Sequence, residues 1–417
     1  MSSSLGAVDL RTVEVADVYK NGRFAGWLRR ERDDVTFTYA AEYRDDPVAP
    51  SVAYSLPKST GMFRTTGGSV PPFFAGLLPE GVRLGAVTRA NRTSEDDHFT
   101  ILLSVGADTI GDVQVVAAGI APQSPLPIFD EEDSTAVDFA ELFTRATAGD
   151  LEMIDRTALP GVQMKVSAEM LSTPVITTGG PAILKLDPAE YPLLVDNEEF
   201  FLNMAHDAGI SVPNHRLGVD RTGRKALFVE RFDRVVDTAA IRRLAQEDAC
   251  QVLGRYPAAK YRMSMQEAII GLASAVREGG GSYRLASLRM LEIAAFSYLI
   301  GNGDLHGKNL SIRRDTDGLW GVTPAYDLLS TQPYLGWNDP MALQLYGRAA
   351  KLTRRWWLDA ADRLGVPERA ITKSLTRIID SAEPWLCRMD AIGYDDKTTD
   401  RLAALVSGRR AELYGRQ

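Results

Sequence analysis

The chain has 417 residues, of which 45% are hydrophobic and 24% are charged, and this composition is typical of a folded globular protein. The length favours two or three domains, and no apolar run approaches the ~20 residues that a membrane-spanning helix needs. The net charge of −8 argues against a large DNA-binding surface on this chain.

The N-terminus and the cysteines bear on the cellular compartment. Met1 to Leu10 lacks the basic region and the apolar core of a secretory signal. Cys250 and Cys387 lie far apart and predict neither a disulfide framework nor a zinc site. We therefore expect a reducing, cytoplasmic location and no membrane association.

Residues 1–118 predict a small mixed domain. Val15 to Tyr19 and Phe24 to Leu28 are strand-like and flank Asn21-Gly22, a strong hairpin signal. A helix is expected to begin at Thr93-Ser94 and to end at Gly106. Three prolines and an acidic run in residues 121–134 are typical of a linker or an exposed loop, so we place a domain boundary near residue 118.

Residues 119–235 predict a second domain with the element order of a nucleotide-binding lobe. Strands are expected at 166–171 and 182–186 with a turn at 178–180, and a hairpin is expected near residue 222. An amphipathic helix is expected at 197–208, capped by Asp196 or Asn197. Residues 236–417 predict a helical domain, in which Ser264 to Glu267 is a capping box.

The segment from Asn302 to Asn309 carries the most information about chemistry. It follows an apolar helical run and contains Asp304 and Asn309, which are separated by four residues. In kinase-type phosphoryl transfer, a base Asp and a metal-binding Asn have this spacing. Asp327 follows in a turn and is a second candidate oxygen ligand, so the three residues meet the minimum that a magnesium-dependent phosphoryl-transfer site requires.

Lys185 lies in an apolar strand, where a charged side chain must reach water or a partner. One interpretation is an edge-strand lysine whose amine reaches solvent; the other is the phosphate-orienting lysine of a kinase-like strand. The element order favours the second, because a helix that carries an acid follows. Glu198 is the expected partner and Glu199 is the alternative, although an acid at a helix start is also favoured by the helix dipole.

Weaker signals lie around these residues. The loop from Gly161 to Lys165 can offer backbone N–H groups to phosphate, although one glycine before a strand commonly makes only a turn. The segment 229–234 is either a hinge at the adenine site or a strand end with exposed charges. His306 either orients the loop or contacts phosphate, or is simply a structural loop histidine, and Lys308 is placed to neutralise charge on a transferred phosphoryl group.

In this order, the segments resemble the HipA family, the serine/threonine-protein kinase toxins of bacterial toxin–antitoxin modules. The matching stretches extend over nearly the whole chain: 77–81, 159–165, 183–186, 195–198, 229–234, 303–309 and 323–330. The resemblance implies an α+β, bilobal protein-kinase-like fold. Its parts would be an N-terminal coupling subdomain (1–118), a β-rich ATP-binding lobe (119–235) and an all-helical C-terminal lobe (236–417).

The resemblance also implies roles for the site residues. Asp304 is expected to be the catalytic base, assisted by Lys185, His306 and Lys308, and Asn309 and Asp327 are expected to hold magnesium. The expected ATP-binding residues come from the glycine loop, the strand lysine, the hinge and the catalytic segment: Pro160, Gly161, Val162, Gln163, Met164, Lys165, Lys185, Glu230, Arg231, Phe232, Asp304, His306, Tyr326 and Asp327.

The implied partners are a HipB-like helix-turn-helix antitoxin, which carries most contacts to operator DNA, and a protein substrate such as an aminoacyl-tRNA synthetase. One departure from the family is Ala158, where members often carry a serine that is autophosphorylated; Thr157 stands beside it. Self-inactivation is therefore in doubt or shifts to Thr157. Two alternatives remain: a small-molecule kinase with a similar Asp-x₄-Asn loop, and a non-catalytic corepressor that scaffolds a DNA-binding partner.

Overall fold

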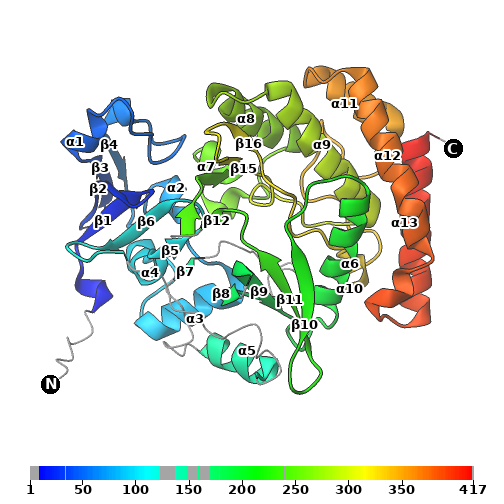
Figure 1. Cartoon of the computed structure of the whole chain (residues 1–417), viewed down its shortest axis with the longest axis horizontal. Helices are drawn as coiled ribbons and strands as arrows, with labels where there is room; N and C mark the ends of the chain where they lie inside the picture. Colours follow the sequence, from blue (N-terminus) through cyan, green and yellow to red (C-terminus); the bar gives the residue numbers. More distant parts are fainter. Residues whose placement is uncertain are drawn as a thin grey trace.

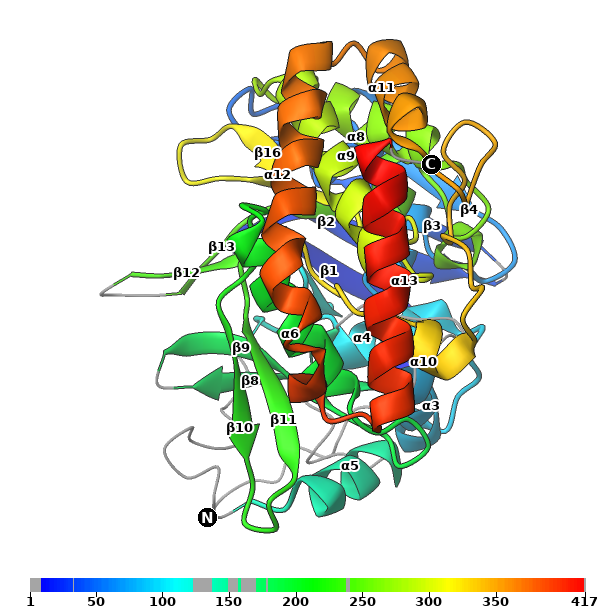
Figure 2. The same ribbon diagram turned by 90° about the vertical axis from the view of Figure 1, so that its right-hand side faces the viewer.

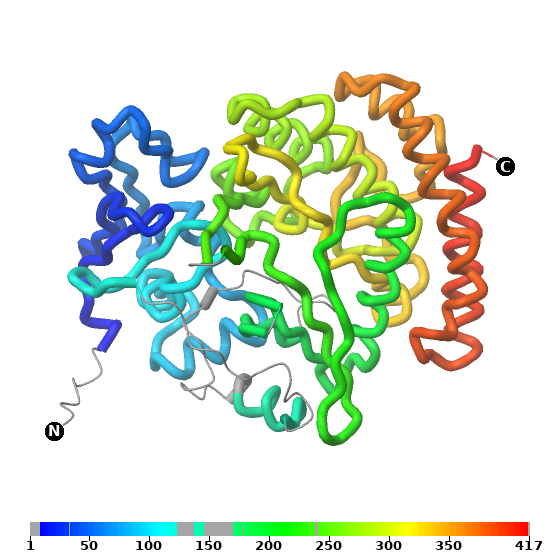
Figure 3. The backbone as a smooth tube through the Cα atoms, in the orientation of Figure 1, coloured from blue at the N-terminus to red at the C-terminus, as the bar shows by residue number. Residues whose placement is uncertain are grey.

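The computed structural model describes residues 9–32, 34–122, 137–148, 157–158, 170–177, 179–237 and 241–415. Three parts follow one another along the backbone: an N-terminal domain, a four-stranded sheet with its helix, and a mainly helical lobe (Figure 3). Among the described segments, no helix has both the length and the apolar character that crossing a bilayer requires.

The N-terminal domain is built on an antiparallel five-stranded sheet. Its order is β4-β3-β2-β1-β6, with β1 at Val15–Lys20, β2 at Arg23–Glu31, β3 at Asp34–Tyr39, β4 at Met62–Thr65 and β6 at Val113–Ala117. The expected hairpin is confirmed, because Asn21 and Gly22 both have positive φ (49° and 73°), as a type I′ turn between β1 and β2 requires. Phe37, Phe74 and Ile101 are fully buried in the core of this domain.

The helices of this domain differ from the expectation. Residues predicted as one helix from Thr93 form only α4 (His98–Val105), because the side chain of Asp97 caps it by accepting from the N–H of Thr100 (3.2 Å). A second helix, α3 (Gly81–Asn91), was not predicted. The short helix α2 (Pro72–Ala75) and the residues up to Gly81 turn toward the rest of the molecule (Figure 1).

The second part is a four-stranded antiparallel sheet in the order β10-β11-β9-β8. Its strands are β8 (Leu171–Thr177), β9 (Gly180–Leu186), β10 (His215–Val219) and β11 (Lys225–Glu230). Most of the strand expected at 166–171 falls within residues 159–169, which lie outside the described residues, and β8 begins at Leu171. Helix α5 (Phe139–Ala148) buries Phe139 against this sheet.

Helix α6 (Leu194–Asp207) connects the sheet to the helical lobe. The predicted caps, Asp196 and Asn197, lie inside this helix, so that prediction was wrong. The physical reason is that Asp187, at the end of β9, accepts a hydrogen bond from the N–H of Val195 (2.8 Å), so the first turn is capped from outside the helix. Burial raises the pKa of Asp187 to about 6.

The C-terminal lobe is mainly helical. Its helices are α7 (Ala249–Val252), α8 (Met265–Glu278), α9 (Tyr283–Ile300), α10 (Gln332–Leu335), α11 (Arg354–Arg363), α12 (Glu368–Leu386) and α13 (Asp396–Tyr414). Ser264 caps α8 as expected, accepting from the N–H of Glu267 (3.3 Å). Helix α9 is buried along most of its length, and α12 and α13 pack side by side over it on the face away from the N-terminal domain (Figure 2).

This lobe also carries strands, which corrects the expectation of an all-helical lobe. Strands β14 (Gln246–Asp248), β15 (Ser311–Arg314) and β16 (Trp320–Val322) form a small antiparallel sheet, and β12 (Arg234–Val236) pairs with β13 (Ile241–Arg243). Strands β15 and β16 form a hairpin through which the chain returns from the segment around Asp304 toward Asp327. The turn at Asp315 to Gly318 makes that return.

An ionic cluster joins the N-terminal domain to the start of the helical lobe. Arg231 and Arg234 approach Asp108 at 2.8 Å and 2.5 Å, and both also pair with Asp233 (2.9 Å and 2.6 Å). A further arginine, Arg243, approaches Asp108 at 2.7 Å. Burial alone would raise the pKa of Asp108, but the three guanidinium groups hold that pKa far below its usual range.

Candidate active site

The loop after α9 is held in shape by the side chains of two asparagines, Asn302 and Asn309. Gly301 ends the helix with a φ of 79°, and the chain then folds back on itself. Asn302 accepts from the N–H of Asp304 (2.9 Å) and donates to the backbone oxygen of Asp327 (3.1 Å). The amide of Asn309 donates to the backbone oxygen of Asp304 (3.1 Å). These hydrogen bonds join the backbone at Asp304 and at Asp327 through Asn302, and the backbone at Asp304 to Asn309, in one compact unit.

Lys185 reaches this unit from β9. Its Nζ lies 2.6 Å and 2.8 Å from the two carboxylate oxygens of Glu198 and 2.6 Å from Oδ1 of Asp327. The expected contact with Glu198 is present, whereas Glu199 accepts from Asn203 (2.6 Å) instead. Burial would lower the pKa of Lys185, but the two carboxylates outweigh burial and raise that pKa, so the lysine is charged.

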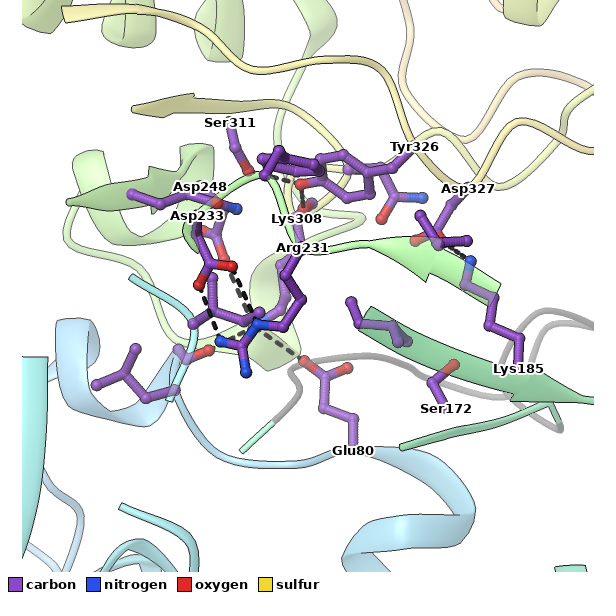
Figure 4. Close-up of a pocket in the computed structure, with 18 of the residues that line it drawn as sticks. Glu80, Ser172, Lys185, Arg231, Asp233, Asp248, Lys308, Ser311, Tyr326 and Asp327 are labelled. Carbon is purple, nitrogen blue, oxygen red and sulfur yellow. Dashed lines mark hydrogen bonds and ion pairs between the residues drawn. The ribbon is translucent and has the colours of Figure 1, made fainter. Parts of the chain in front are cut away.

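A cavity lies where the three parts meet, and Figure 4 shows Lys185 and Asp327 at one side of it and Arg231 with Asp233 at the other. Each part of the molecule contributes to its lining: Gly76, Glu80 and Arg83 from the N-terminal domain, Ile183, Lys185 and Val229 from the sheet, and Asn309, Tyr326 and Asp327 from the helical lobe. Apolar walls with a few convergent charges are typical of cofactor sites.

The predicted hinge residues have different surroundings. Glu230, Phe232 and Tyr326 line the cavity, and the rings of Phe232 and Tyr326 are 5.7 Å apart in a tilted arrangement. Arg231 also lines the cavity, but its guanidinium is bound by Asp108 and Asp233. Its observed contacts therefore join the domains, and a role in nucleotide binding stays a prediction.

Two other predicted catalytic residues, Asp304 and His306, are buried within the loop. Asp304 is 1% exposed, and it accepts a hydrogen bond from the hydroxyl of Tyr261 (2.6 Å). His306 packs edge-on against the ring of Tyr261 (5.1 Å) and its Nδ1 accepts from the N–H of Lys308 (3.3 Å). Neither Asp304 nor His306 lines the cavity, so their predicted contacts with a cofactor are not seen in this geometry.

The side chain of Lys308 points toward the N-terminal domain. Its Nζ donates to the backbone oxygen of Gly76 (2.9 Å) and lies 3.2 Å from Glu80 and 3.5 Å from Asp248. Sequence reasoning placed Lys308 at a transferred phosphoryl group and did not find these contacts. The resemblance did mark residues 77–81, but nothing in one sequence shows which residue Glu80 meets.

The predicted glycine loop, Pro160, Gly161, Val162, Gln163, Met164 and Lys165, lies outside the described residues. Thr157 and Ala158, on which the expectation about autophosphorylation rests, form strand β7, which pairs in parallel with β5 (Asp108–Thr109) of the N-terminal domain. The backbone just before the loop is therefore attached next to the ionic cluster at Asp108.

Two family models match this chain in succession. The HipA N-terminal domain matches residues 16–116, and the HipA-like C-terminal domain matches residues 157–386, which is more than half of the chain. The chain belongs to the HipA family. The first match covers the N-terminal sheet, and the second begins at β7 and ends with α12, so it leaves out α13. The three-domain division at residues 118 and 235 stays a prediction.

Relatives of this HipA-family chain are similar over most of their length. The putative kinase Y4mE of Sinorhizobium fredii is 30% identical over 95% of this chain and 98% of its own. The serine/threonine-protein kinase toxin HipA of Shewanella oneidensis is 28% identical over 83% of each chain.

A solved structure shows the same fold. A chain in the complex of Shewanella oneidensis HipA, HipB and operator DNA matches with a TM-score of 0.74 and 22% identity, covering 96% of this chain and 98% of that one. The expected α+β, bilobal kinase-like fold with an N-terminal coupling domain is thereby confirmed for this HipA-family chain.

Proposed function

We propose that this chain is an ATP- and magnesium-dependent serine/threonine-protein kinase and the toxin of a HipBA-like toxin–antitoxin module. The observation that carries the proposal is the position of Lys185. Its ammonium group lies between Glu198 and Asp327, at the wall of a cavity that Asn309 also lines. A lysine held by a helix glutamate beside a metal-ligand aspartate is the arrangement that positions nucleotide phosphates in protein kinases.

The residues fit a magnesium-bound nucleotide. Asn309 and Asp327 both offer oxygen atoms at the cavity wall, and oxygen donors are the ligands that magnesium prefers. Phe232, Tyr326 and Val229 supply apolar surface for a base. Magnesium held by Asn309 and Asp327 would neutralise charge on the phosphate oxygens, and Lys185 would then pair with phosphate as well as with Glu198.

The proton step is assigned to Asp304. Its carboxylate is kept in place by the hydroxyl of Tyr261, and the loop backbone around it is fixed by Asn302 and Asn309. Asp304 accepts or orients the proton of a substrate serine or threonine hydroxyl as that oxygen attacks the terminal phosphorus. The remaining barrier reduction comes from positioning, since phosphoryl transfer requires little covalent chemistry from the protein.

The partners follow from the relatives and the charge. A solved relative is bound to HipB and operator DNA. With a net charge of −8, this chain is poorly suited to bind DNA over a large surface, which supports contact with operator DNA through a small helix-turn-helix antitoxin. The protein substrate is proposed to belong to the translation machinery, for example an aminoacyl-tRNA synthetase, which places the enzyme in the cytoplasm.

The test is transfer of label from γ-labelled ATP with magnesium to proteins in a host extract. A labelled protein band is expected, and Asp304→Asn should weaken it by roughly 10²–10⁴, the usual contribution of a general base. Asp315→Asn, on the exposed turn after β15, is the matched control and should keep wild-type activity. Label found only in small molecules would instead establish a small-molecule kinase. Calorimetry that finds no binding of Mg-ATP would establish a scaffold.

A further inference from the structure

The segment 77–81 belongs to the N-terminal domain, yet one of its side chains reaches the catalytic loop. Glu80 lies between α2 and α3 at the edge of the cavity (Figure 4). Its Oε2 lies 2.6 Å from Nζ of Lys260, and its Oε1 lies 3.2 Å from Nζ of Lys308. One carboxylate of the N-terminal domain thus joins two lysines of the helical lobe.

Lys260 connects this carboxylate to the proposed base. Its side chain is fully buried, and its backbone oxygen accepts from the N–H of Gly307 (3.0 Å) inside the catalytic loop. The next residue, Tyr261, donates its hydroxyl to Asp304 (2.6 Å). The pair Lys260-Tyr261 therefore holds the loop at two points, and Glu80 is the carboxylate that holds Lys260.

Lys308 provides the second connection. It lies within the loop itself, and its backbone oxygen accepts from the hydroxyl of Tyr326 (2.6 Å), next to Asp327. Two buried ammonium groups need buried negative charge nearby, since an uncompensated buried charge is strongly unfavourable. Burial would raise the pKa of Glu80, but Lys308 and Lys260 outweigh burial and hold the pKa below its usual range, so Glu80 is ionised.

We propose that Glu80 is a positioning residue through which the N-terminal domain holds the catalytic loop in its working geometry. The inference rests on the proposed kinase function and deepens it. Glu80 acts through Lys260 and Lys308, and has no assigned contact with the substrate or the cofactor. Without its charge, Lys260-Tyr261 and Lys308 lose their common anchor, and the loop that carries Asp304 moves more freely.

The test combines two measurements on the full-length chain. Hydrogen exchange of the peptide that contains residues 303–309 reports loop order and does not depend on activity. Label transfer from γ-labelled ATP at saturating nucleotide reports turnover, and its dependence on ATP concentration separates kcat from KM. Glu80→Gln keeps the shape of the side chain and removes its charge. Asp112→Asn is the matched control, because Asp112 forms a similarly buried pair with Lys20 (2.7 Å) away from the loop.

In Glu80→Gln, loop exchange is expected to be about tenfold faster, and kcat to fall by roughly 10–100-fold with little change in the KM for ATP. Asp112→Asn should change neither quantity. The double variant Glu80→Gln with Lys260→Met removes one charge of each sign, which protects folding, and it should still show the faster loop exchange.

Wild-type loop exchange in both Glu80 variants would overturn the inference, and so would faster exchange with an unchanged kcat. A wild-type chain that transfers no label would instead overturn the proposed kinase function, and the exchange measurement would then decide the role of Glu80 alone.

Discussion

The side-chain amide of Asn197 binds both backbone groups of Ser330. Its Nδ2 donates to the oxygen of Ser330 (2.8 Å) and its Oδ1 accepts from the N–H of the same residue (2.9 Å). Asn197 precedes Glu198 on α6, and Ser330 lies three residues after Asp327. The helix that holds Lys185 through Glu198 is therefore tied directly to the segment that supplies Asp327.

Asn197→Ala should loosen this connection. Two buried backbone groups of Ser330 lose their partner, and we expect a loss of roughly 2–4 kcal/mol in the free energy of unfolding, since each unsatisfied group costs ~1–3 kcal/mol. Because Glu198 and Asp327 are then less well aligned, we expect about tenfold weaker binding of Mg-ATP by calorimetry. Asn203→Ala on the same helix is the control. Equal ATP affinity in the two variants would contradict the expectation.

Lys185→Met should strengthen the stabilisation by magnesium. Removing the ammonium leaves Glu198 and Asp327 facing each other without a cation, and like charges at this distance are unfavourable. We expect magnesium chloride without nucleotide to raise the melting temperature of the variant more than that of the wild type, while label transfer falls by roughly 10² or more. Lys225→Met, in the same sheet, should behave like the wild type in both measurements.

Glu247 predicts a pH dependence of stability. It is buried beneath the N-terminal domain, where its Oε1 accepts from the N–H of Tyr54 (2.8 Å). Burial raises the pKa of Glu247 to about 7, and the nearby Lys20 offsets only part of this effect. The unfolded chain then binds fewer protons than the folded chain between ~pH 4.5 and 7, so the contribution of Glu247 to stability falls as pH rises through this window.

Glu247→Gln should remove this dependence. Relative to the wild type, the variant should gain free energy of unfolding as pH rises from 5 to 8, by roughly 1–3 kcal/mol in total. Urea unfolding of both chains at each pH measures the difference. Glu278→Gln, which removes an exposed acid at the end of α8, should show a constant difference. A constant difference for Glu247→Gln as well would show that this carboxyl does not titrate in that range.

Asp108→Asn should weaken the junction between the N-terminal domain and the helical lobe. Asp108 is the shared partner of Arg231, Arg234 and Arg243, and its neutralisation leaves Asp233 as the nearest acid to buried guanidinium groups. We expect a loss of ~3–5 kcal/mol in the free energy of unfolding, as for other broken buried ion pairs. Asp46→Asn, which removes the partner of the exposed Arg23, should cost less than ~1 kcal/mol in the same urea titration.

Local signals in the sequence were sufficient for much of the fold. The Asn21-Gly22 turn and the Ser264 cap are decided by residues within a few positions of each other, and both are present. The same holds for the Asp304 and Asn309 spacing, because one loop carries both residues. The α+β class followed from the order of such elements together with the family resemblance.

The missed features depend on partners that are distant in sequence. The first turn of α6 is capped by Asp187, which precedes the helix in the chain. The polar residues inside the helix therefore led to a wrong prediction of where the helix begins. From the sequence alone, Arg231 was predicted to be a hinge residue. In the structure its guanidinium binds Asp108, which is 123 residues away. Likewise, the side chain of Lys308 points toward Gly76 and Glu80, with which its ammonium group interacts. Such a contact between distant residues leaves no periodic pattern in a single sequence.

The cavity between three parts also has a consequence for the growing polypeptide. Its closing contacts join Gly76 to Lys308 and Lys185 to Asp327, over 232 and 142 positions of sequence. Because synthesis proceeds from the N-terminus and contacts at such separation form after local ones, we expect the N-terminal domain to fold before its partners leave the ribosome. A prematurely terminated product that ends before Asp327 therefore lacks part of the cavity wall and the carboxylate that contacts Lys185.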